Sequence, residues 1–263
     1  MKKFPSHINE LFSLEGKVAV IIGGGGHICS SLAEGYALAG ASVSIVDLRV
    51  EKALRISKNI NSKYGNKTIY IQADAGKEDS LQNALFLTLK EYSKIDILIN
   101  GAGKNSPKPF LEIAIKEWDD VMKSQITATM LGCKIFGSQM LKQKKGSIIN
   151  ISSASAGPPL SKAFAYSVAK AGIKNLTMNL AREWATDNVR VNAIRPGFFP
   201  TKWNKKNFIN PQREQAIMNH TPMKRFGEPH ELIGAAIWLA SDSSNFVSGA
   251  EITVDGGFSC MTI

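Results

Sequence analysis

The sequence KVAVIIGGGG occupies residues 17–26 and decides the fold. Its apolar part predicts a buried strand over 17–22, and four glycines then interrupt it. A helix is expected over 30–39, ending at Gly40. Glycines between a strand and a helix let the backbone approach a pyrophosphate at the positive end of the helix. The stretch therefore predicts a phosphate-binding turn, although ordinary tight turns also use glycine.

The rest of the chain alternates the same two kinds of element. Further strands are predicted at 42–46, 68–73, 96–100, 147–152, 189–194 and 252–254. Further helices are predicted at 51–64, 77–92, 117–142, 165–187 and 228–241. Such alternation implies parallel strands, and their apolar character implies a sheet covered on both faces. We therefore expect an α/β fold, a single domain over 16–263 with one doubly wound parallel sheet of seven strands, preceded by an N-terminal extension over 1–15.

Composition narrows the class of protein. The chain has 263 residues, of which 44% are hydrophobic, and these values suit one large globular domain. No apolar run approaches the roughly 20 residues of a membrane span, and no secretory signal is recognisable. Three scattered cysteines and four histidines form no zinc or disulfide pattern. We expect no metal, no membrane partner and a cytoplasmic location.

The net charge of +10 is the one unusual value. It would suit nucleic acid, but no basic helix or nucleic-acid-binding motif accompanies it, so we expect no nucleic-acid partner. The segment 202–225 supplies half of the excess. It contains six basic residues and one acid, namely Lys202, Lys205, Lys206, Arg213, Lys224, Arg225 and Glu214.

Polar and small residues end the second, third and fourth predicted strands. Asp47 can accept a hydrogen bond from a ribose 2′-OH and would repel a 2′-phosphate, whereas the nearby Arg49 would favour one. Asp47 could also be a simple turn residue. Asp74 is a candidate for the adenine or for a helix cap. The NGAG sequence at 100–103 would let backbone lie against a cofactor, as a plain turn also would.

Tyr166 and Lys170 are four residues apart in a predicted helix, so their side chains share one face. A neighbouring ammonium favours the phenolate and moves its pKa toward working pH, so the tyrosine can exchange a proton with an alcohol or ketone. Ser153, 13 residues before Tyr166, follows the fifth predicted strand and could hold the substrate oxygen. A tyrosine and a lysine four residues apart are common in helices, so without this context their spacing does not indicate an active site.

Taken together, these motifs resemble the short-chain dehydrogenase/reductase family over 16–258. The resemblance also includes Arg195-Pro196-Gly197, the stretch 221–229 and Asp255-Gly256-Gly257. It implies a Rossmann fold, a bound nicotinamide dinucleotide and a homotetramer, with a homodimer as the alternative. It further implies that Ser153 polarises the substrate oxygen, that Tyr166 is the acid/base, and that Lys170 lowers the tyrosine pKa and binds the nicotinamide ribose.

The resemblance and the strand ends together give a set of candidate site residues. The catalytic candidates are Ser153, Tyr166, Lys170 and Gln125. The candidates for holding the cofactor, expected to be NAD in preference to NADP, are Gly23, Gly26, His27, Ile28, Asp47, Leu48, Asp74, Ala75, Asn100, Gly101, Ala102, Tyr166, Lys170, Pro196, Gly197, Phe199 and Thr201.

Several positions depart from the family pattern. Ile22, His27 and Cys29 replace a threonine and two glycines of the usual glycine turn. His27 is expected to occupy the start of the helix, and Cys29 is small enough for close packing between helix and strand. The active-site asparagine of the family, which holds a water in a proton relay through the lysine, falls on Gln125. The same amide on a longer stem leaves open whether the relay operates.

The substrate is the least determined feature. The chain resembles most the branch of D-mannonate (fructuronate) oxidoreductases and gluconate 5-dehydrogenases. A basic substrate lid at about 200–225, facing Lys104 and Lys108, would attract a carboxylate, although each lysine could equally be a solvated surface residue. We expect a small anionic substrate such as a sugar acid. The alternatives are a 3-oxoacyl thioester reductase of the same family and a dinucleotide-binding pseudoenzyme.

Overall fold

The structure, a computed structural model, describes residues 7–65, 67–201, 205 and 209–261. Its centre is one seven-stranded sheet in the order β3-β2-β1-β4-β5-β6-β7, in which every neighbouring pair is parallel. The strands are β1 (Val18–Ile22), β2 (Ser42–Asp47), β3 (Thr68–Gln72), β4 (Ile97–Asn100), β5 (Gly146–Ile151), β6 (Val189–Pro196) and β7 (Glu251–Val254). The predicted α/β fold with a doubly wound parallel sheet is confirmed.

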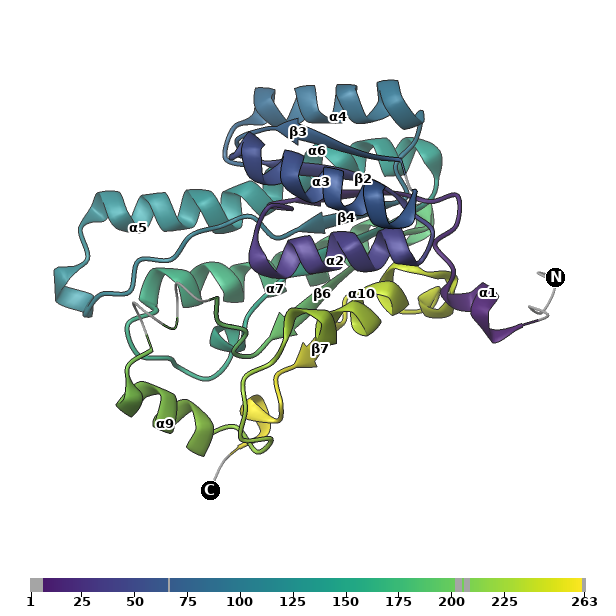
Figure 1. Ribbon diagram of the computed structural model, residues 1–263. Helices are drawn as coiled ribbons and strands as arrows, with labels where there is room; N and C mark the ends of the chain where they lie inside the picture. Colours follow the sequence, from purple (N-terminus) through teal and green to yellow (C-terminus); the bar gives the residue numbers. More distant parts are fainter. Residues whose placement is uncertain (1–6, 66, 202–204, 206–208, 262–263) are drawn as a thin grey trace.

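Helices cover both faces of this sheet (Figure 1). One layer contains α2 (His27–Leu38), α3 (Val50–Tyr64) and α10 (Ile233–Ala240), and the other contains α4 (Glu78–Tyr92), α6 (Ala128–Gln143) and α7 (Phe164–Trp184). Successive side chains of β1 point to opposite layers, because Ala19 and Ile21 pack with α2 while Val20 and Ile22 pack with α6. All five residues of β1 are therefore buried, which explains its uninterrupted apolar sequence.

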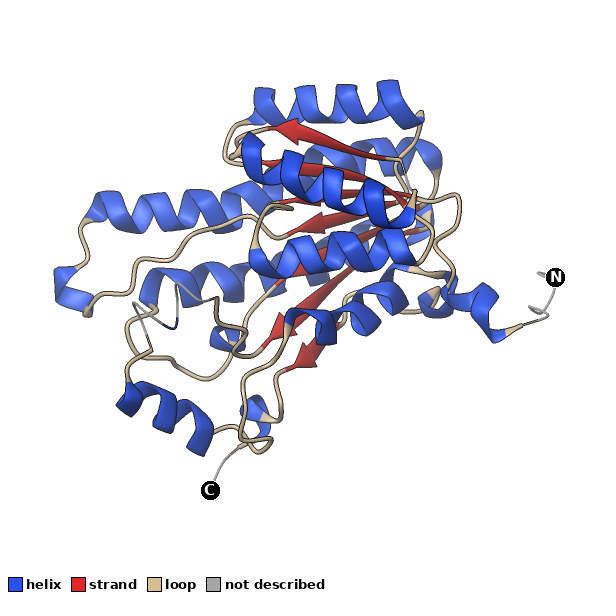
Figure 2. Cartoon of the chain, in the orientation of Figure 1, coloured by secondary structure: helices blue, strands red, loops and turns tan. Residues whose placement is uncertain are grey.

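The strands all point toward the same edge of the sheet (Figure 2). The chain order reverses between β1 and β4, because β1 continues to β2 on one side while β4 leads to β5 on the other. A crevice opens outside the carboxyl ends of strands at such a switch point, and ligands of doubly wound sheets bind there. The glycine turn follows β1 and Ser153 follows β5, so both predicted motifs lie at this edge.

Several elements among the described residues differ from the sequence-based expectation. Helix α2 begins at His27, three residues earlier than predicted, because the turn ends at Gly26. The single helix predicted at 117–142 consists of α5 (Ile115–Met122), one π-helical turn over Lys123–Thr127, and α6. Two short helices were not predicted: α1 (Ile8–Phe12) in the N-terminal extension and α9 (Pro211–Asn219) in the predicted lid.

Among the described residues, no helix is both long and apolar enough to cross a membrane. Six residues of the predicted lid, at 202–204 and 206–208, lie outside the described residues, and they include the basic residues Lys202 and Lys206.

Candidate active site

The glycine turn is fixed by hydrogen bonds to the end of β2. The backbone N–H groups of Gly23 and Gly24 donate to the carbonyl of Val46 at 2.7 and 3.1 Å. Gly23 has a φ of +78°, and a Cβ at this position would lie 2.7 Å from the backbone nitrogen of Ala102. Only glycine therefore fits the first position of the turn, both for its backbone conformation and for its contact with the segment after β4.

The N-terminus of α2 opens directly from this turn. Gly26 is the N-cap, and no described side chain caps the helix. His27 is exposed at the first helical position, as expected, and Ile28 packs against the core. The first N–H groups of a helix have no partner within it, and the helix dipole makes this end positive. These groups fit a pyrophosphate, which would supply the acceptors they lack.

Cys29 brings the helix close to β4. Its thiol is buried and contacts Gly101 so closely that no side chain could replace the glycine hydrogen. Burial raises the pKa of the Cys29 thiol to about 12, so the sulfur stays protonated at neutral pH. The interpretation of Cys29 as a packing residue is confirmed. Ala102, the next residue of the NGAG sequence, packs against the layer of α4 and α6.

Asp47 links the turn to the end of β2. Its carboxylate is 6% exposed and accepts hydrogen bonds from the backbone N–H groups of Gly25 and Arg49, each at 2.9 Å. The guanidinium Nε of Arg49 lies 3.7 Å from the same carboxylate. A carboxylate can accept about four hydrogen bonds, so capacity for a ribose hydroxyl remains. The neighbouring Leu48 is 61% exposed at this edge.

Asp74 and Asn100 both form hydrogen bonds within the protein. Asp74 accepts a hydrogen bond from the N–H of Gly76 at 2.9 Å, and it does not cap α4, whose N-cap is Lys77. Ala75 packs against the core. Asn100 is buried and donates to Asn150 at 2.9 Å, so its side chain joins β4 to β5 instead of pointing out of the sheet.

The catalytic candidates converge at the end of β5. The Lys170 ammonium donates to the carbonyl of Ile151 at 2.6 Å and lies 5.5 Å from the centre of the Tyr166 ring. The hydroxyl of Ser153 accepts hydrogen bonds from the backbone N–H and the hydroxyl of Ser155, at 3.2 and 3.1 Å. Ser155 was missed from the sequence, since one serine in a run of small residues carries no distinguishing signal.

Burial shifts the pKa values of the two titratable catalytic candidates. Burial raises the pKa of Tyr166 above its ordinary value, and a hydrogen bond with Ser153 acts in the opposite direction. Burial also lowers the pKa of Lys170 to about 8. Removing a phenol from water disfavours its charged form, whereas a neighbouring ammonium favours it, so the lowering of the tyrosine pKa by Lys170 stays a prediction. The Tyr166 hydroxyl is therefore protonated at neutral pH in this environment.

Gln125 lies in the π-helical turn between α5 and α6. Its amide Nε2 donates to the carbonyl of Lys104 at 2.9 Å, and its backbone carbonyl accepts from the Thr129 hydroxyl at 2.9 Å. Its side chain packs against Gly103. The amide Oε1 is buried without a hydrogen-bond partner among the described residues. π-helical turns concentrate at functional sites, and this one accommodates the side chain beside the NGAG segment.

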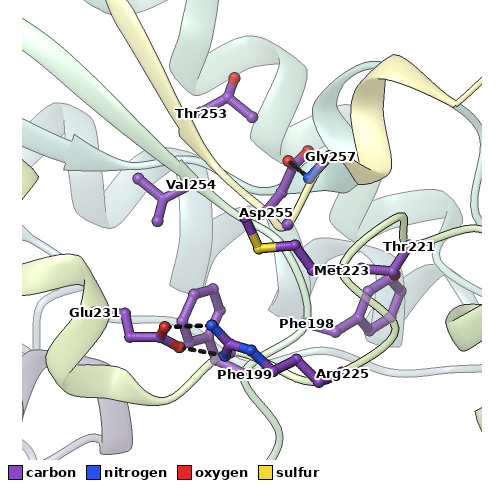
Figure 3. A pocket seen from close by; sticks show the side chains of 12 residues that line it. Phe198, Phe199, Thr221, Met223, Arg225, Glu231, Thr253, Val254, Asp255 and Gly257 are labelled. Atoms are coloured by element: carbon purple, nitrogen blue, oxygen red, sulfur yellow. Dashed lines mark hydrogen bonds and ion pairs between the residues drawn. The ribbon is translucent and has the colours of Figure 1, made fainter.

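The remaining cofactor candidates follow β6. The N–H of Gly197 donates to Val254 at 3.0 Å, and a Cβ on Gly197 would lie 2.7 Å from Asp255 Cα, so Pro196 and Gly197 are held against the end of β7. The Phe199 ring packs on Gly227. The carbonyl of Thr201 accepts from the N–H of Lys205 at 3.0 Å. Phe199 also lines a cavity of about 390 Å³ between this loop and β7 (Figure 3).

Several cations of the predicted basic lid have partners already. Arg225 forms a two-point ion pair with Glu231 at 2.7 and 2.6 Å (Figure 3), and Lys224 donates to the last carbonyls of α9. On the facing loop, Lys104 and Lys108 pair with Asp120 and Glu117. The expected attraction for a carboxylate is weaker than the sequence indicates, because these charges are neutralised locally.

Arg213 on α9 differs from these cations. It donates to the hydroxyl and the carbonyl of Ser161, both at 3.4 Å, and no acid among the described residues pairs with it. Ser161 belongs to the loop that joins Ser153 to Tyr166. The Arg213 guanidinium therefore joins the predicted lid to the loop between two of the catalytic candidates.

The start of α2, which suits a phosphate, and the hydroxyl of Tyr166 lie toward the same edge of the sheet, and a bound dinucleotide that exchanges hydride would use both. Fold and site together define a dinucleotide-dependent oxidoreductase.

Comparison with known proteins gives the family. The sequence model of the family described as "Enoyl-(Acyl carrier protein) reductase" matches residues 26–259. The uncharacterized oxidoreductase UxuB of Bacillus subtilis is 39% identical over 275 residues, which cover 97% of each chain. The chain belongs to the short-chain dehydrogenase/reductase family, as its resemblance predicted, and it acts on CH–OH groups with a nicotinamide cofactor.

Two solved structures lie in the predicted branch. A Haemophilus influenza protein named D-mannonate oxidoreductase, with bound NAD, is 34% identical with a TM-score of 0.90, over 97% of this chain and 99% of that chain. A gluconate 5-dehydrogenase from Burkholderia cenocepacia, in complex with NADP and tartrate, is 29% identical with a TM-score of 0.93, over 97% and 100% of the two chains. The two relatives carry different nicotinamide cofactors, so the cofactor preference of this chain depends on its own residues.

Proposed function

We propose that the protein transfers hydride reversibly between NAD(H) and a secondary alcohol or ketone of a sugar acid. The observation that carries this proposal is the convergence of Ser153, Tyr166 and Lys170 at the end of β5, beside the glycine turn. When bound, the nicotinamide supplies the hydride acceptor or donor. The protein supplies the binding edge and the proton.

The dinucleotide would lie along the carboxyl edge of the sheet. The free N–H groups at the start of α2 and the glycines Gly23 and Gly26 would hold the pyrophosphate. Asp47 would bind the adenosine ribose, followed by Leu48, while Asp74 and Ala75 would border the adenine. Lys170 would bind the nicotinamide ribose. The remaining contacts would come from His27, Ile28, Asn100, Gly101, Ala102, Tyr166, Pro196, Gly197, Phe199 and Thr201.

Proton transfer would take place at the Tyr166 hydroxyl. Because burial keeps this phenol protonated, it is ready to donate a proton to a ketone oxygen that becomes an alkoxide. In the opposite direction, the phenolate must form first, and the buried Lys170 ammonium would stabilise it. Ser153 would hold the substrate oxygen beside the phenol, and Gln125 would support proton exchange with solvent through Lys170.

An anionic polyhydroxylated substrate is supported by two observations. Arg213 joins the lid to the loop between Ser153 and Tyr166 and has no acidic partner among the described residues. One structural relative carries the name "putative D-Mannonate oxidoreductase", and the other is a gluconate 5-dehydrogenase that holds tartrate, a hydroxy acid. A carboxylate beside Arg213 would gain a charge-assisted hydrogen bond. We propose that the segment 200–225 forms the lid over this site.

NAD in preference to NADP is proposed from the surroundings of Asp47. If the carboxylate of Asp47 binds the ribose, as proposed, it would repel a 2′-phosphate there, because the two groups carry like charges. Arg49 is 55% exposed and already lies against Asp47, so part of its charge is offset. The balance favours the uncharged ribose hydroxyl.

A homotetramer is proposed from an exposed apolar surface around α5, α6 and α7, with a homodimer as the alternative. Its members are Phe110, Leu111, Ile115, Met130, Phe164, Val168 and Met178, each at least 39% exposed. The ring centres of Phe110 and Phe164 lie 5.2 Å apart with their planes tilted by 59°, and this contact joins the segment before α5 to the start of α7. Apolar side chains gathered in this way favour burial against another subunit. Light scattering after size exclusion measures the assembly directly.

The deciding experiment is a spectrophotometric screen at 340 nm with NAD and NADP. Its panel contains hexonates, keto-hexonates, polyols and acyl thioesters. NAD-linked turnover of a hexonate supports the proposal. Turnover restricted to NADPH and 3-oxoacyl thioesters would replace it with the thioester reductase, and silence across the panel with calorimetric NADH binding would indicate a pseudoenzyme.

A further inference from the structure

A buried ion pair lies behind Ser153 and has no part in the site as described so far. Glu251 on β7 and Arg195 on β6 expose only 10% and 11% of their side chains, and the Arg195 Nη1 lies 3.3 Å from Glu251 Oε2. The Lys174 ammonium approaches the same carboxylate at 3.6 Å. Removing such charges from water is unfavourable, and an apolar pair of similar size often stabilises a fold at least as well.

The pair contacts the chain on both sides of Ser153. The Ser152 hydroxyl donates to Glu251 Oε1 at 2.6 Å. The Arg195 Nη2 donates to the carbonyl of Ala154 at 3.3 Å. Ser152 and Ala154 are the two neighbours of Ser153 in the sequence, so one ion pair holds both residues that flank the catalytic candidate.

The contact extends along the turn that Ser153 begins. The Arg195 guanidinium packs directly against Gly157, where any Cβ would collide with it. Ser153 itself is the N-cap of the 3-10 turn Ala154–Ala156, and its hydroxyl direction depends on where this turn lies. On the opposite side, Lys170 holds the carbonyl of Ile151. The segment 151–157 is thus fixed by polar groups from β6, β7 and α7.

We propose that Arg195 and Glu251 are positioning residues that orient the Ser153 hydroxyl for the reaction. This inference rests on the proposed role of Ser153. Neither residue reaches the reacting atoms. They act by holding the backbone on both sides of Ser153, so that its hydroxyl faces the substrate oxygen beside Tyr166.

A double-mutant cycle tests this inference. Arg195→Lys keeps the charge but shortens the side chain and removes the planar group that reaches Ala154. With the fastest substrate of the 340 nm screen, kcat is expected to fall about tenfold, while KM for the cofactor stays within a factor of two. In a Ser153→Ala background, the same substitution is expected to change kcat less than twofold, because the hydroxyl it positions is gone.

A matched control separates positioning from general stability. Arg190 is also on β6, and its guanidinium donates to the carbonyls of Leu239 and Ser241, at the opposite end of the strand. Arg190→Lys should lower the melting temperature about as much as Arg195→Lys but leave kcat unchanged. A second variant, Ser152→Ala, keeps the ion pair and removes only the hydroxyl that donates to it. It should lower kcat about threefold when Ser153 is present, and should have no such effect in the Ser153→Ala background.

The outcomes are distinguishable. An equal loss of kcat from Arg195→Lys with and without the Ser153 hydroxyl would overturn the positioning role, and so would an unchanged kcat. Wild-type turnover by Ser153→Ala would instead overturn the proposed role of Ser153 itself. A crystal structure of Arg195→Lys adds a readout that needs no substrate, since residues 153–157 should be displaced, and an unmoved segment contradicts the inference.

Discussion

The two halves of the carboxyl edge are built in different ways. Around the glycine turn, the positions are set by backbone N–H groups, by missing side chains at Gly23 and Gly101, and by one carboxylate, Asp47. Around Ser153, they are set by buried charged side chains from β6, β7 and α7, among them Lys170 and Arg195. The first half suits a ligand that brings its own charge, and the second suits a reaction in which charge appears and disappears.

The largest effect expected from this difference is at the catalytic half. Tyr166→Phe removes the proton donor but keeps the ring, so kcat should fall by roughly 10²–10⁴. Cofactor affinity, measured by calorimetry, should change less than twofold. Tyr70→Phe on β3, where the ring is 44% exposed, is the matched control and should keep full turnover. Substantial turnover by Tyr166→Phe would contradict the proposed mechanism.

Lys170 tests how much the burial of its charged form lowers the free energy of unfolding. Its pKa is lowered from 10.5 to about 8 in the folded protein, so between these values the unfolded chain binds more protons. The stability of the wild type should therefore rise with pH across this window relative to Lys170→Met, by roughly 3 kcal/mol at most. Denaturant unfolding at pH 7 and pH 10 measures it. A difference that is independent of pH would contradict the burial effect, and Lys116→Met, at an 86% exposed side chain, is the control.

At the glycine turn, geometry should matter more than charge. Gly23→Ala places a Cβ against the backbone of Ala102 at a φ of +78°, so both the strain and the collision act together. We expect cofactor affinity to fall more than tenfold and the melting temperature to drop. Gly65→Ala is the matched control, since Gly65 has a φ of +65° but no atom within 4 Å of its Cβ position. It should lose only about 1 kcal/mol of stability and no cofactor affinity.

The smallest effect is expected at Asp47, the carboxylate beside the glycine turn. Asp47→Asn removes the repulsion toward a 2′-phosphate and keeps an acceptor for one of the two backbone N–H groups, because Gly25 and Arg49 donate to different oxygens of the carboxylate. The ratio of kcat/KM for NAD over NADP should fall about tenfold. Asp74→Asn, which alters a carboxylate bonded to Gly76, should leave that ratio unchanged. An unchanged ratio in Asp47→Asn would remove Asp47 as the basis of the cofactor preference.

The sequence was most informative where contacts are local. The first strand, the glycine turn, the helix that follows the turn and Asp47 all lie within residues 17–47. The pattern of strand, glycines and helix predicts them directly. The start of α2 at His27 was missed by three residues because histidine carries no clear helix-start signal. The π-helical turn around Gln125 was also missed, since it continues a helical pattern without any interruption that a periodicity could show.

By itself, the sequence predicted the parallel seven-stranded sheet and the motifs that follow its strands, because apolar periodicity and glycine chemistry act over a few residues. Only the tertiary structure determined which charged groups are paired and how burial shifts their pKa values. It paired Lys104, Lys108 and Arg225 with nearby acids, buried Tyr166 so that its pKa is raised, and joined Arg195 to Glu251 across 56 residues. Ion pairing and protonation depend on which charged groups lie close together and on how far they are removed from water, and both are set only when the chain folds.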